Sequence, residues 1–175
     1  MSGVAMGPER SALDEALEAR SGESAASADE GSLAVLVFEL DGEAFAFEGR
    51  YIKAVLPMSE PFFVPGCPPT LEGVILHQGE VESLIDISPA LGRKPLAKGK
   101  SRFVLIGQTA GLRSGIRVDL VVDVLSIPES SLIPTPASVR QALRDMSTRA
   151  IERGGGLVPL LDLPSVFAAW ARGAG

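Results

Sequence analysis

The chain repeats one pattern of strands and turns, and this repeat restricts its possible folds more than any other feature. Seven positions between Val35 and Leu56 are matched, each 69 positions later, by seven positions of similar character. The matched residues are Val35, Val37, Gly42, Phe47, Ile52, Val55 and Leu56 in the first copy and Val104, Ile106, Gly111, Ile116, Val121, Val124 and Leu125 in the second. Two copies of one pattern predict two structurally related halves.

A second match, at a spacing of 76 positions, relates two hairpins. The first lies within residues 71–92, where two apolar runs flank His77-Gln78-Gly79-Glu80. A glycine at position 79 can adopt the positive φ that a tight hairpin turn needs. The matched residues are Gly79, Val81, Leu84, Ile85, Asp86 and Ile87 in the first hairpin and Gly155, Leu157, Leu160, Leu161, Asp162 and Leu163 in the second.

The other segments can be assigned from turn residues and spacing. Residues 33–49 predict two strands around Asp41-Gly42, which is a strong hairpin signal, and residues 102–128 predict two strands around a turn at Gly111. In residues 50–57 the apolar positions have helical spacing, which predicts a short helix ended by Pro57, and the piece ended by Pro128 is its counterpart. Four prolines within residues 59–70 predict an irregular, extended loop.

Short, turn-rich strands of this kind close into small barrels, because closure removes exposed strand edges. We therefore expect a mainly β domain of two small barrels that share a core, with short helices and a C-terminal helix that has Pro164 in its first turn. The repeated halves span about residues 33–92 and 102–170, and the basic linker between them is expected to be a solvated loop. A groove between two such halves is a common place for a ligand or partner.

Charge separates the first residues from the rest of the chain. Residues 1–32 contain seven acidic and two basic side chains, a net charge of −5 out of −6 for the whole chain. Their composition predicts a disordered acidic tail before a folded domain of residues 33–175, with a docking peptide for a partner as the alternative. The folded part is nearly neutral, which argues against a nucleic-acid-binding protein.

Targeting signals and membrane spans are not predicted. No apolar run approaches the roughly 20 residues that a membrane-spanning helix needs. The N-terminal segment has neither the basic nor the apolar region of a secretory signal, and the single cysteine excludes an internal disulfide. We expect a soluble, cytoplasmic protein that is not inserted in a membrane.

Catalytic chemistry has little support in the sequence. The chain has one cysteine, Cys67, and one histidine, His77, and no Cys/His cluster with the spacing of metal ligands. The three aspartates Asp86, Asp119 and Asp162 follow strands and are better suited to capping helical turns than to acid–base catalysis. We expect a binding module with no catalytic residue, cofactor or metal; a Cys67–His77 nucleophile pair is a minor alternative.

Five segments in order carry a family resemblance that covers about residues 33–170. They are VFELDGEAFAF, IKAVLP, VPGCPPTLEGVILHQGEVESLIDI, IRVDLVVDVLSIP and GGGLVPLLDL. The chain resembles the CheW family, the adaptor proteins of bacterial chemosensory arrays. The resemblance implies two intertwined five-stranded SH3-like barrels. It also implies a scaffold that bridges the cytoplasmic tip of methyl-accepting chemoreceptors and the regulatory domain of a CheA-type histidine kinase, at receptor arrays.

The resemblance also implies partner-binding residues. A helical receptor hairpin is expected to bind between the halves, at Ile52, Val55 and Leu56, with Val121 and Val124 as counterparts across the repeat. The alternative is that some of these side chains fill the core. The hairpin tip at His77, Gln78 and Glu80 is expected to face a partner, and contacts with other CheW-like proteins through the barrels are a further expectation.

Three departures from the family pattern concern these contacts. The family usually has an arginine where this chain has Gln78, often has an acid at Ala54, and commonly has an apolar residue and proline at Glu82-Ser83. Glutamine cannot offer a carboxylate the charged fork of a guanidinium. The sequence therefore leaves two functions open, the bridging adaptor and a divergent accessory protein that binds only one of these partners, or a different one, and modulates the array without bridging.

Overall fold

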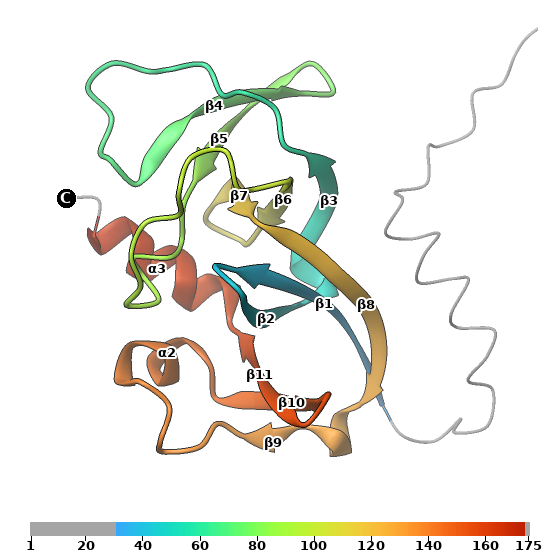
Figure 1. Cartoon of the computed structure of the whole chain (residues 1–175). Coiled ribbons are helices and arrows are strands. Elements are labelled where there is room, and N and C mark those ends of the chain that lie inside the picture. The colour runs from blue at the N-terminus through green and yellow to red at the C-terminus, as the bar shows by residue number, and fades with distance from the viewer. Residues whose placement is uncertain (1–30, 174–175) are drawn as a thin grey trace, which may run out of the picture.

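The structure, a computed structural model, describes residues 31–173 (Figure 1). The predicted acidic tail, residues 1–32, lies outside the described residues except for its last two, and Ser32 already belongs to the first strand. The fold is mainly β, as predicted, with two antiparallel-rich sheets and a few short helices.

Two sheets make up the domain. Sheet A has the strand order β8 (Leu120–Pro128), β1 (Ser32–Leu40), β2 (Glu43–Glu48), β11 (Gly156–Leu161), β10 (Arg149–Arg153) and β9 (Ile133–Pro134). Sheet B has the order β3 (Ile52–Pro57), β6 (Phe103–Gln108), β7 (Arg113–Val118), β5 (Glu80–Ile85) and β4 (Leu71–His77). Sheet A thus has six strands instead of the expected five, because the two-residue β9 adds an edge. Among the described residues, strand pairing does not close either sheet into a complete barrel.

The two sequence halves exchange strands. β3 comes from the first half but pairs with β6 of the second, whereas β8 comes from the second half and pairs with β1 of the first. The repeat places β3 and β8 at equivalent positions, so the exchange is reciprocal. Each sheet is therefore built from both halves, which is the intertwined arrangement that the resemblance implied.

Helices are short and lie at the connections. They are the single 3₁₀ turns η1 (Gly49–Tyr51) and η2 (Glu129–Ser131), α2 (Gln141–Met146) and the C-terminal α3 (Leu163–Gly173). The prediction of a terminal helix is confirmed, with Pro164 in its first turn and Val166 and Phe167 buried. Among residues 31–173, none of the helices combines the length and the apolar character needed to cross a membrane.

Apolar side chains form three clusters. The central core lies between the sheets and includes Phe38, Phe45 and Phe47 with side chains of α3. The sheet A core contains Val35, Val37, Ala46, Ile151, Val158 and Leu160. The sheet B core contains Ile75, Leu84, Val104 and Ile106, with Ala54, Leu56 and Met58 packed against it. Because strand side chains alternate between faces, each strand can supply both its own sheet's core and the central core.

The predicted helix over residues 50–57 is wrong. A single 3₁₀ turn precedes Ile52, and residues 52–57 form β3, with five residues paired in register to β6. The counterpart that ends at Pro128 is likewise a strand, β8. Eight residues are too few to sustain a helix without tertiary support, and pairing to β6 supplies that support to an extended strand instead.

Two of the three aspartates cap helical turns, as predicted. Asp86 accepts hydrogen bonds from the Ser88 N–H at 2.8 Å and the Leu96 N–H at 2.7 Å. Asp162 accepts one from the Ser165 N–H in the first turn of α3, at 3.1 Å. For Asp119 the prediction is wrong, since β8 follows it; its carboxylate accepts from the Asp41 N–H at 2.7 Å and fastens the β1–β2 turn.

The basic linker is only partly a solvated loop. Lys94, Lys98 and Lys100 are exposed, but Leu96 is buried at 8% exposure. Arg93 forms ion pairs with Glu43 and Asp41 on the β1–β2 hairpin. The linker is thus held to the β1–β2 hairpin by Arg93 and to the central core by Leu96.

Candidate functional site

Four of the predicted receptor-contact residues lie together along the central core. Ile52 is inside that core at 3% exposure, and Val55, Val121 and Val124 are partly buried and pack against it. Val55 comes from β3 and the other two valines from β8, the two exchanged strands. Ile52 is a core residue, which agrees with the alternative that some of these side chains fill the core, and its contact with a partner stays a prediction.

Leu56 lies apart from this group. In a helix it would share a face with Ile52 and Val55, but in β3 it points to the opposite side and packs against the sheet B core. Leu56 is therefore partly buried on the sheet B side, away from Val55, and its role as a partner contact stays a prediction.

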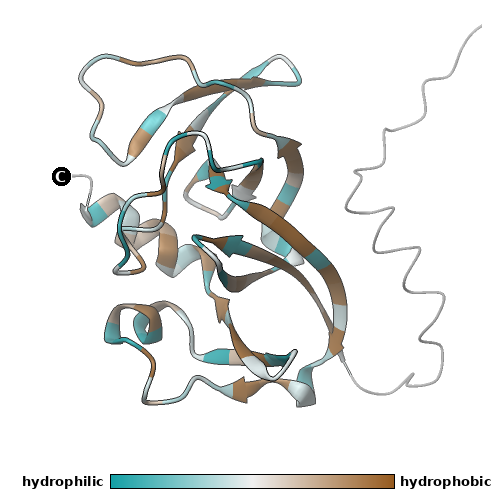
Figure 2. Cartoon of the chain, in the orientation of Figure 1, coloured by the Kyte–Doolittle hydropathy of each residue, from teal (hydrophilic) through white to brown (hydrophobic). Residues whose placement is uncertain are grey.

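The partly exposed apolar residues of the two exchanged strands form a surface that we name the seam. It consists of Val55, Val121 and Val124, with Leu120 and Val122 beside them at 37% and 39% exposure. Among residues 31–173, β8 is an edge strand that pairs with β1 alone, and it is hydrophobic along most of its length (Figure 2). An apolar edge strand next to a core is a natural contact surface, because a partner can cover its partly exposed apolar side chains.

The predicted tip residues lie together at the end of the β4–β5 hairpin. His77 pairs with Glu80 across the turn, and Gln78 and Gly79 have φ angles of 49° and 79°. Positive φ at both central residues is the signature of the type I′ hairpin turn. Gln78 and Glu80 are exposed and His77 is half-buried, so the tip presents polar side chains to solvent.

Next to the tip, Arg113 of β7 forms ion pairs with Glu80 and Glu82 of β5. Glu82 is 5% exposed and its carboxylate accepts a hydrogen bond from Arg113 Nε at 2.7 Å. Arg113 Nη2 also lies 3.7 Å from a Glu80 carboxylate oxygen. The sequence did not reveal this cluster, because Arg113 is 31 positions from Glu82 and only the β5–β7 pairing brings them together.

An apolar strip lies on the same hairpin and was also missed. Leu76 and Val81 are cross-strand partners with exposures of 67% and 69%. Phe62, at 68% exposure, is joined to Val74 by two backbone hydrogen bonds of 2.8 and 3.0 Å. Paired residues share a face of a sheet, and Val74 and Leu76 are two apart, so the four side chains lie on one face. We name Phe62, Val74, Leu76 and Val81 the hairpin strip.

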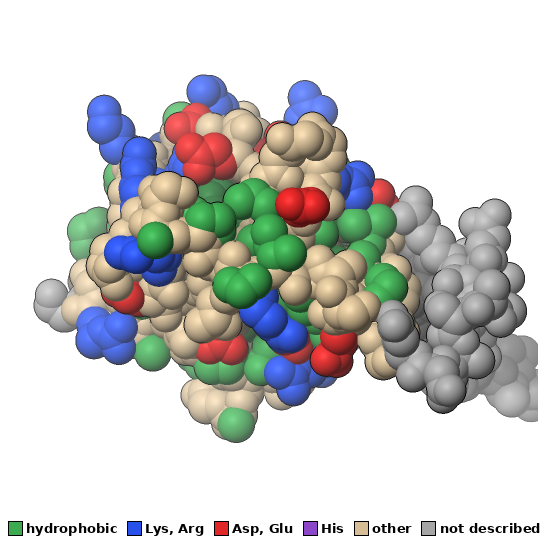
Figure 3. All heavy atoms as spheres, turned by 90° about the horizontal axis from the view of Figure 1, so that it is seen from below, with side chains coloured by type: hydrophobic (Ala, Val, Ile, Leu, Met, Phe, Trp, Pro, Cys, Tyr) green, Lys and Arg blue, Asp and Glu red, His purple; other side chains and the backbone are tan. Residues whose placement is uncertain are grey.

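The β10–β11 hairpin repeats part of this arrangement at the opposite end of the molecule (Figure 1). Leu157, which matches Val81 in the repeat, is 42% exposed. Seen from this end, apolar side chains gather in the middle of the surface, with acidic and basic side chains around them (Figure 3). Each end of the domain therefore has an exposed aliphatic residue directly after a hairpin tip.

The residues considered for catalysis or metal binding do not form a site. Cys67 lines a cavity beneath the loop of residues 59–70, whereas His77 is not among that cavity's lining residues and lies at the hairpin tip. Among residues 31–173, no group of three or more His, Cys, Asp or Glu side chains is arranged to hold a metal ion.

Comparisons with known proteins agree with this architecture. A family model described as the CheW-like domain matches residues 34–170. The chain is 29% identical over 133 residues to a chemotaxis protein CheW from Thermotoga maritima, covering 76% of this chain and 86% of that protein. It is 24% identical over 144 residues to a chemotaxis protein CheW from Rhizobium meliloti, covering 82% of this chain and 93% of that protein. The crystal structure of the scaffolding protein TtCheW from Thermoanaerobacter tengcongensis has the same fold, with a TM-score of 0.66 and 22% identity, over 78% of this chain and 93% of that chain.

Proposed function

Because the chain belongs to the CheW-like domain family, we propose that it is a non-catalytic adaptor of a bacterial chemosensory pathway. In this proposal it couples the cytoplasmic tip of methyl-accepting chemoreceptors to the regulatory domain of a CheA-type histidine kinase. Its place of action is the cytoplasmic side of receptor arrays, and further CheW-like proteins are additional partners.

The observation that carries the proposal is the presence of separate contact surfaces on one domain. The hairpin strip lies at one end, Leu157 lies at the other, and the seam runs between the sheets. A protein that bridges partners needs surfaces that can be occupied at the same time. Exposed aliphatic side chains at equivalent positions of the two ends, Val81 and Leu157, suit contacts with other small β-barrel domains.

The seam suits a helical partner. Val55, Val121 and Val124 are partly exposed and supported from behind by the central core, so they need little rearrangement to accept apolar side chains. An amphipathic helix placed along such a surface buries residues spaced by three and four positions. We assign the seam to the receptor tip and the hairpin ends to barrel-shaped partners.

A specific observation supports the alternative function, an accessory protein with only one usual partner. Glu82 is buried in an ion pair with Arg113 of its own chain, and Gln78 occupies the exposed tip position. The tip therefore offers no guanidinium at position 78, where a conventional contact would pair one with a carboxylate.

Simultaneous binding separates the two functions. Purified full-length chain is mixed with a soluble receptor-tip fragment and with the kinase regulatory domain, singly and together, and complexes are resolved by size-exclusion chromatography with light scattering. The adaptor function predicts a ternary complex. Val124→Glu should weaken binding of the receptor-tip fragment and leave binding of the kinase regulatory domain unchanged. Val81→Glu and Leu157→Glu should weaken only the binding of barrel-shaped partners. Binding of a single partner under all conditions would favour the accessory function.

Position 78 gives a second test. A charged hydrogen bond from arginine is worth roughly 1.5–3 kcal/mol, against about 1 kcal/mol for a neutral one. We therefore expect Gln78→Arg to strengthen binding to a conventional partner by roughly tenfold in calorimetric titration. Stability should barely change, because the side chain is exposed and both residues meet the same constraint at a φ of 49°. Equal affinities of the two forms would mean that position 78 makes no contact.

A further inference from the structure

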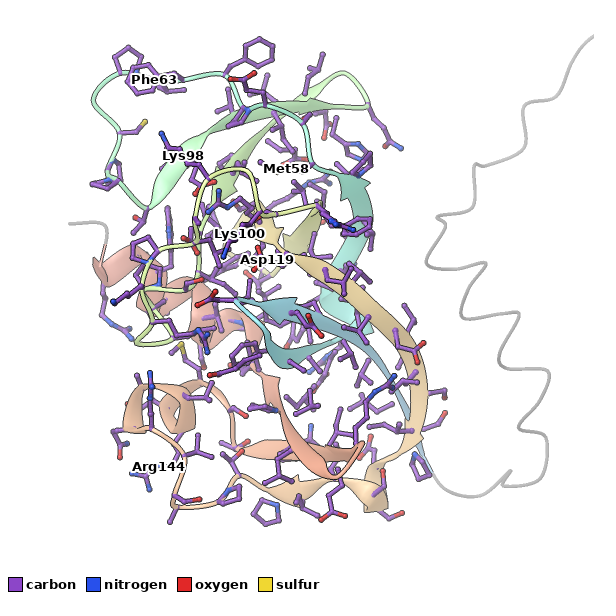
Figure 4. The ribbon with its side chains drawn as sticks, in the orientation of Figure 1. Met58, Phe63, Lys98, Lys100, Asp119 and Arg144 are labelled. Atoms are coloured by element: carbon purple, nitrogen blue, oxygen red, sulfur yellow. The ribbon has the colours of Figure 1, made fainter. Side chains whose placement is uncertain are left out.

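A cavity of about 860 Å³ lies beneath the Pro-rich loop, residues 59–70, at one end of sheet B. Its apolar walls include Met58, Phe63, Val64 and Leu71 with the prolines of the loop. In Figure 4, Phe63 lies on the loop at the top of the molecule, with Met58 and Lys98 beneath it. Pockets that hold small organic ligands span roughly 300–1,000 Å³ and have mainly apolar walls.

The cavity exists because the side chains of the Pro-rich loop do not pack closely onto this end of sheet B. The equivalent connection in the other half, residues 129–148, places Leu132 against the sheet A core. The Pro-rich loop is instead held outward by the Phe62–Val74 hydrogen bonds at its start and by the Trp170 indole N–H, which donates to the Thr70 carbonyl at 3.3 Å. The Pro-rich loop therefore covers an open cavity, whereas the equivalent connection places Leu132 directly on its sheet.

A buried guanidinium lies at the wall of the cavity. Arg117 is 3% exposed, and its Nη2 lies 2.8 Å from the Leu96 carbonyl oxygen and 3.1 Å from a Glu72 carboxylate oxygen. A carboxylate oxygen of Asp86 is 3.9 Å from the same nitrogen. Arg117 Nε, by contrast, is buried without a hydrogen-bond partner among the described residues. Because this nitrogen is shielded from solvent and from the cavity, Arg117 acts on the cavity through its charge and not through a hydrogen bond to a ligand.

Basic side chains outnumber acidic ones around the cavity. Lys98, Arg102 and Arg117 line it, against Glu60 and Glu72. Neither Lys98 nor Arg102 forms an ion pair with another described residue. The lining therefore favours an anion, and the apolar walls favour a hydrocarbon body attached to it.

We propose that this cavity binds a small organic acid that has one carboxylate and an aliphatic or aryl body. The carboxylate pairs with Lys98 or Arg102, whose side chains line the cavity. The hydrocarbon body lies against Met58, Val64 and Leu71. This binding site is separate from the seam and the hairpin strip, and it exists whether or not the chain acts as an adaptor.

The probe for the test is decanoate, and its controls are decanol and decylamine, which have the same chain with a neutral and a cationic head. Calorimetric titration of the full chain should give saturable binding of decanoate, with decanol at least tenfold weaker and decylamine without binding. Decanoate should also slow the alkylation of Cys67, the single cysteine, because that side chain lines the cavity. Absence of decanoate binding, or equal binding of decanoate and decanol, would overturn the proposal.

Three variants locate the site. Lys98→Ala and Arg102→Ala should each weaken decanoate binding severalfold, and Met58→Trp should abolish it by filling the space. The matched control for Lys98→Ala is Lys100→Ala, two positions away, since Lys100 lines a different surface hollow, which Arg102 shares and Lys98 does not. Circular dichroism and melting temperature establish that each variant is folded. Decanoate binding that survives Met58→Trp, or that falls equally with Lys100→Ala, would place the ligand elsewhere and refute the assignment.

Discussion

Replacing Gly73 by alanine should destabilise the domain far more than the same substitution at a glycine in an open turn. Gly73 lies in β4 with a φ of 144°, which side-chain-bearing residues rarely adopt. A Cβ at this position would lie 2.4 Å from the Phe62 carbonyl oxygen and 3.1 Å from Pro61 Cβ. The nearest obstacle is backbone, so the clash cannot be relieved by rotating a side chain.

Two costs add up in this variant. Forcing an alanine into a sparsely populated backbone region costs about 1–3 kcal/mol. Moving Phe62 away breaks its two hydrogen bonds with Val74, at a net cost of about 0.5–1.5 kcal/mol each. The expected loss is therefore about 2–6 kcal/mol in the free energy of unfolding, or a fall of roughly 6–18 °C in melting temperature for a domain of this size.

Two other glycines separate these costs. Gly79 has a φ of 79° but open space around its Cβ position, so Gly79→Ala should lose only about 1–2 kcal/mol. Gly111 has open space and no positive φ, so Gly111→Ala should stay within about 0.5 kcal/mol of the parent. Urea unfolding ranks the three, and hydrogen exchange should accelerate at the Phe62 and Val74 amides only in Gly73→Ala. If Gly73→Ala and Gly111→Ala had the same free energy of unfolding, the close approach of the Pro-rich loop to β4 would be wrong.

Three further predictions concern the core, pH and the N-terminal segment. Ile52→Ala should lose about 2–5 kcal/mol in urea unfolding because Ile52 is 3% exposed, whereas Val122→Ala should lose less than about 1 kcal/mol; similar losses would contradict the placement of Ile52 in the core. Burial raises the pKa of Glu72 despite the nearby Arg117, so the protonated carboxyl is favoured in the folded state. The protonated carboxyl therefore contributes stability at low pH, and this contribution should be lost as pH rises from the ordinary Glu pKa through the raised pKa. Melting temperatures of the parent relative to Glu72→Gln should accordingly be higher near pH 4 than at pH 7, and a constant difference would argue against the shift. A chain that begins at Gly31 retains all of β1 and should melt within a few degrees of full length; a large drop would mean that residues 1–30 stabilise the domain.

Local signals predicted the elements whose structure is decided within a few residues. The β1–β2 and β4–β5 hairpins follow from their turn residues, and the caps at Asp86 and Asp162 follow from carboxylates placed just after strands. The surfaces that matter for binding depend on pairing between distant segments. Phe62 reaches the hairpin strip only through its bridge to Val74, and Arg113 reaches Glu82 only through the β5–β7 pairing. The cavity depends on a loop being held away from its sheet, which no short pattern encodes.

The error over residues 50–57 has a specific physical origin. In β3 the register to β6 shifts between Ile52 and Ala54, so Lys53 is an extra residue; in β8 the register to β1 shifts at the equivalent point, where Val122 is extra. An extra residue in a strand lets side chains three positions apart share a face. Ile52 and Val55, like Val121 and Val124, therefore have the spacing of a helix while they lie in a strand.

The next position distinguishes the two structures. In a helix Leu56 would join Ile52 and Val55, but after the bulge it returns to the opposite face and packs, partly buried, against the sheet B core. Bulges also bend a strand and increase its twist. Both bulges lie in the strands that leave their own half and pair with the other, beside the central core. The helix-like spacing in the sequence is thus caused by the two bulges, which bend β3 and β8 where these strands pair with the other half and form the seam.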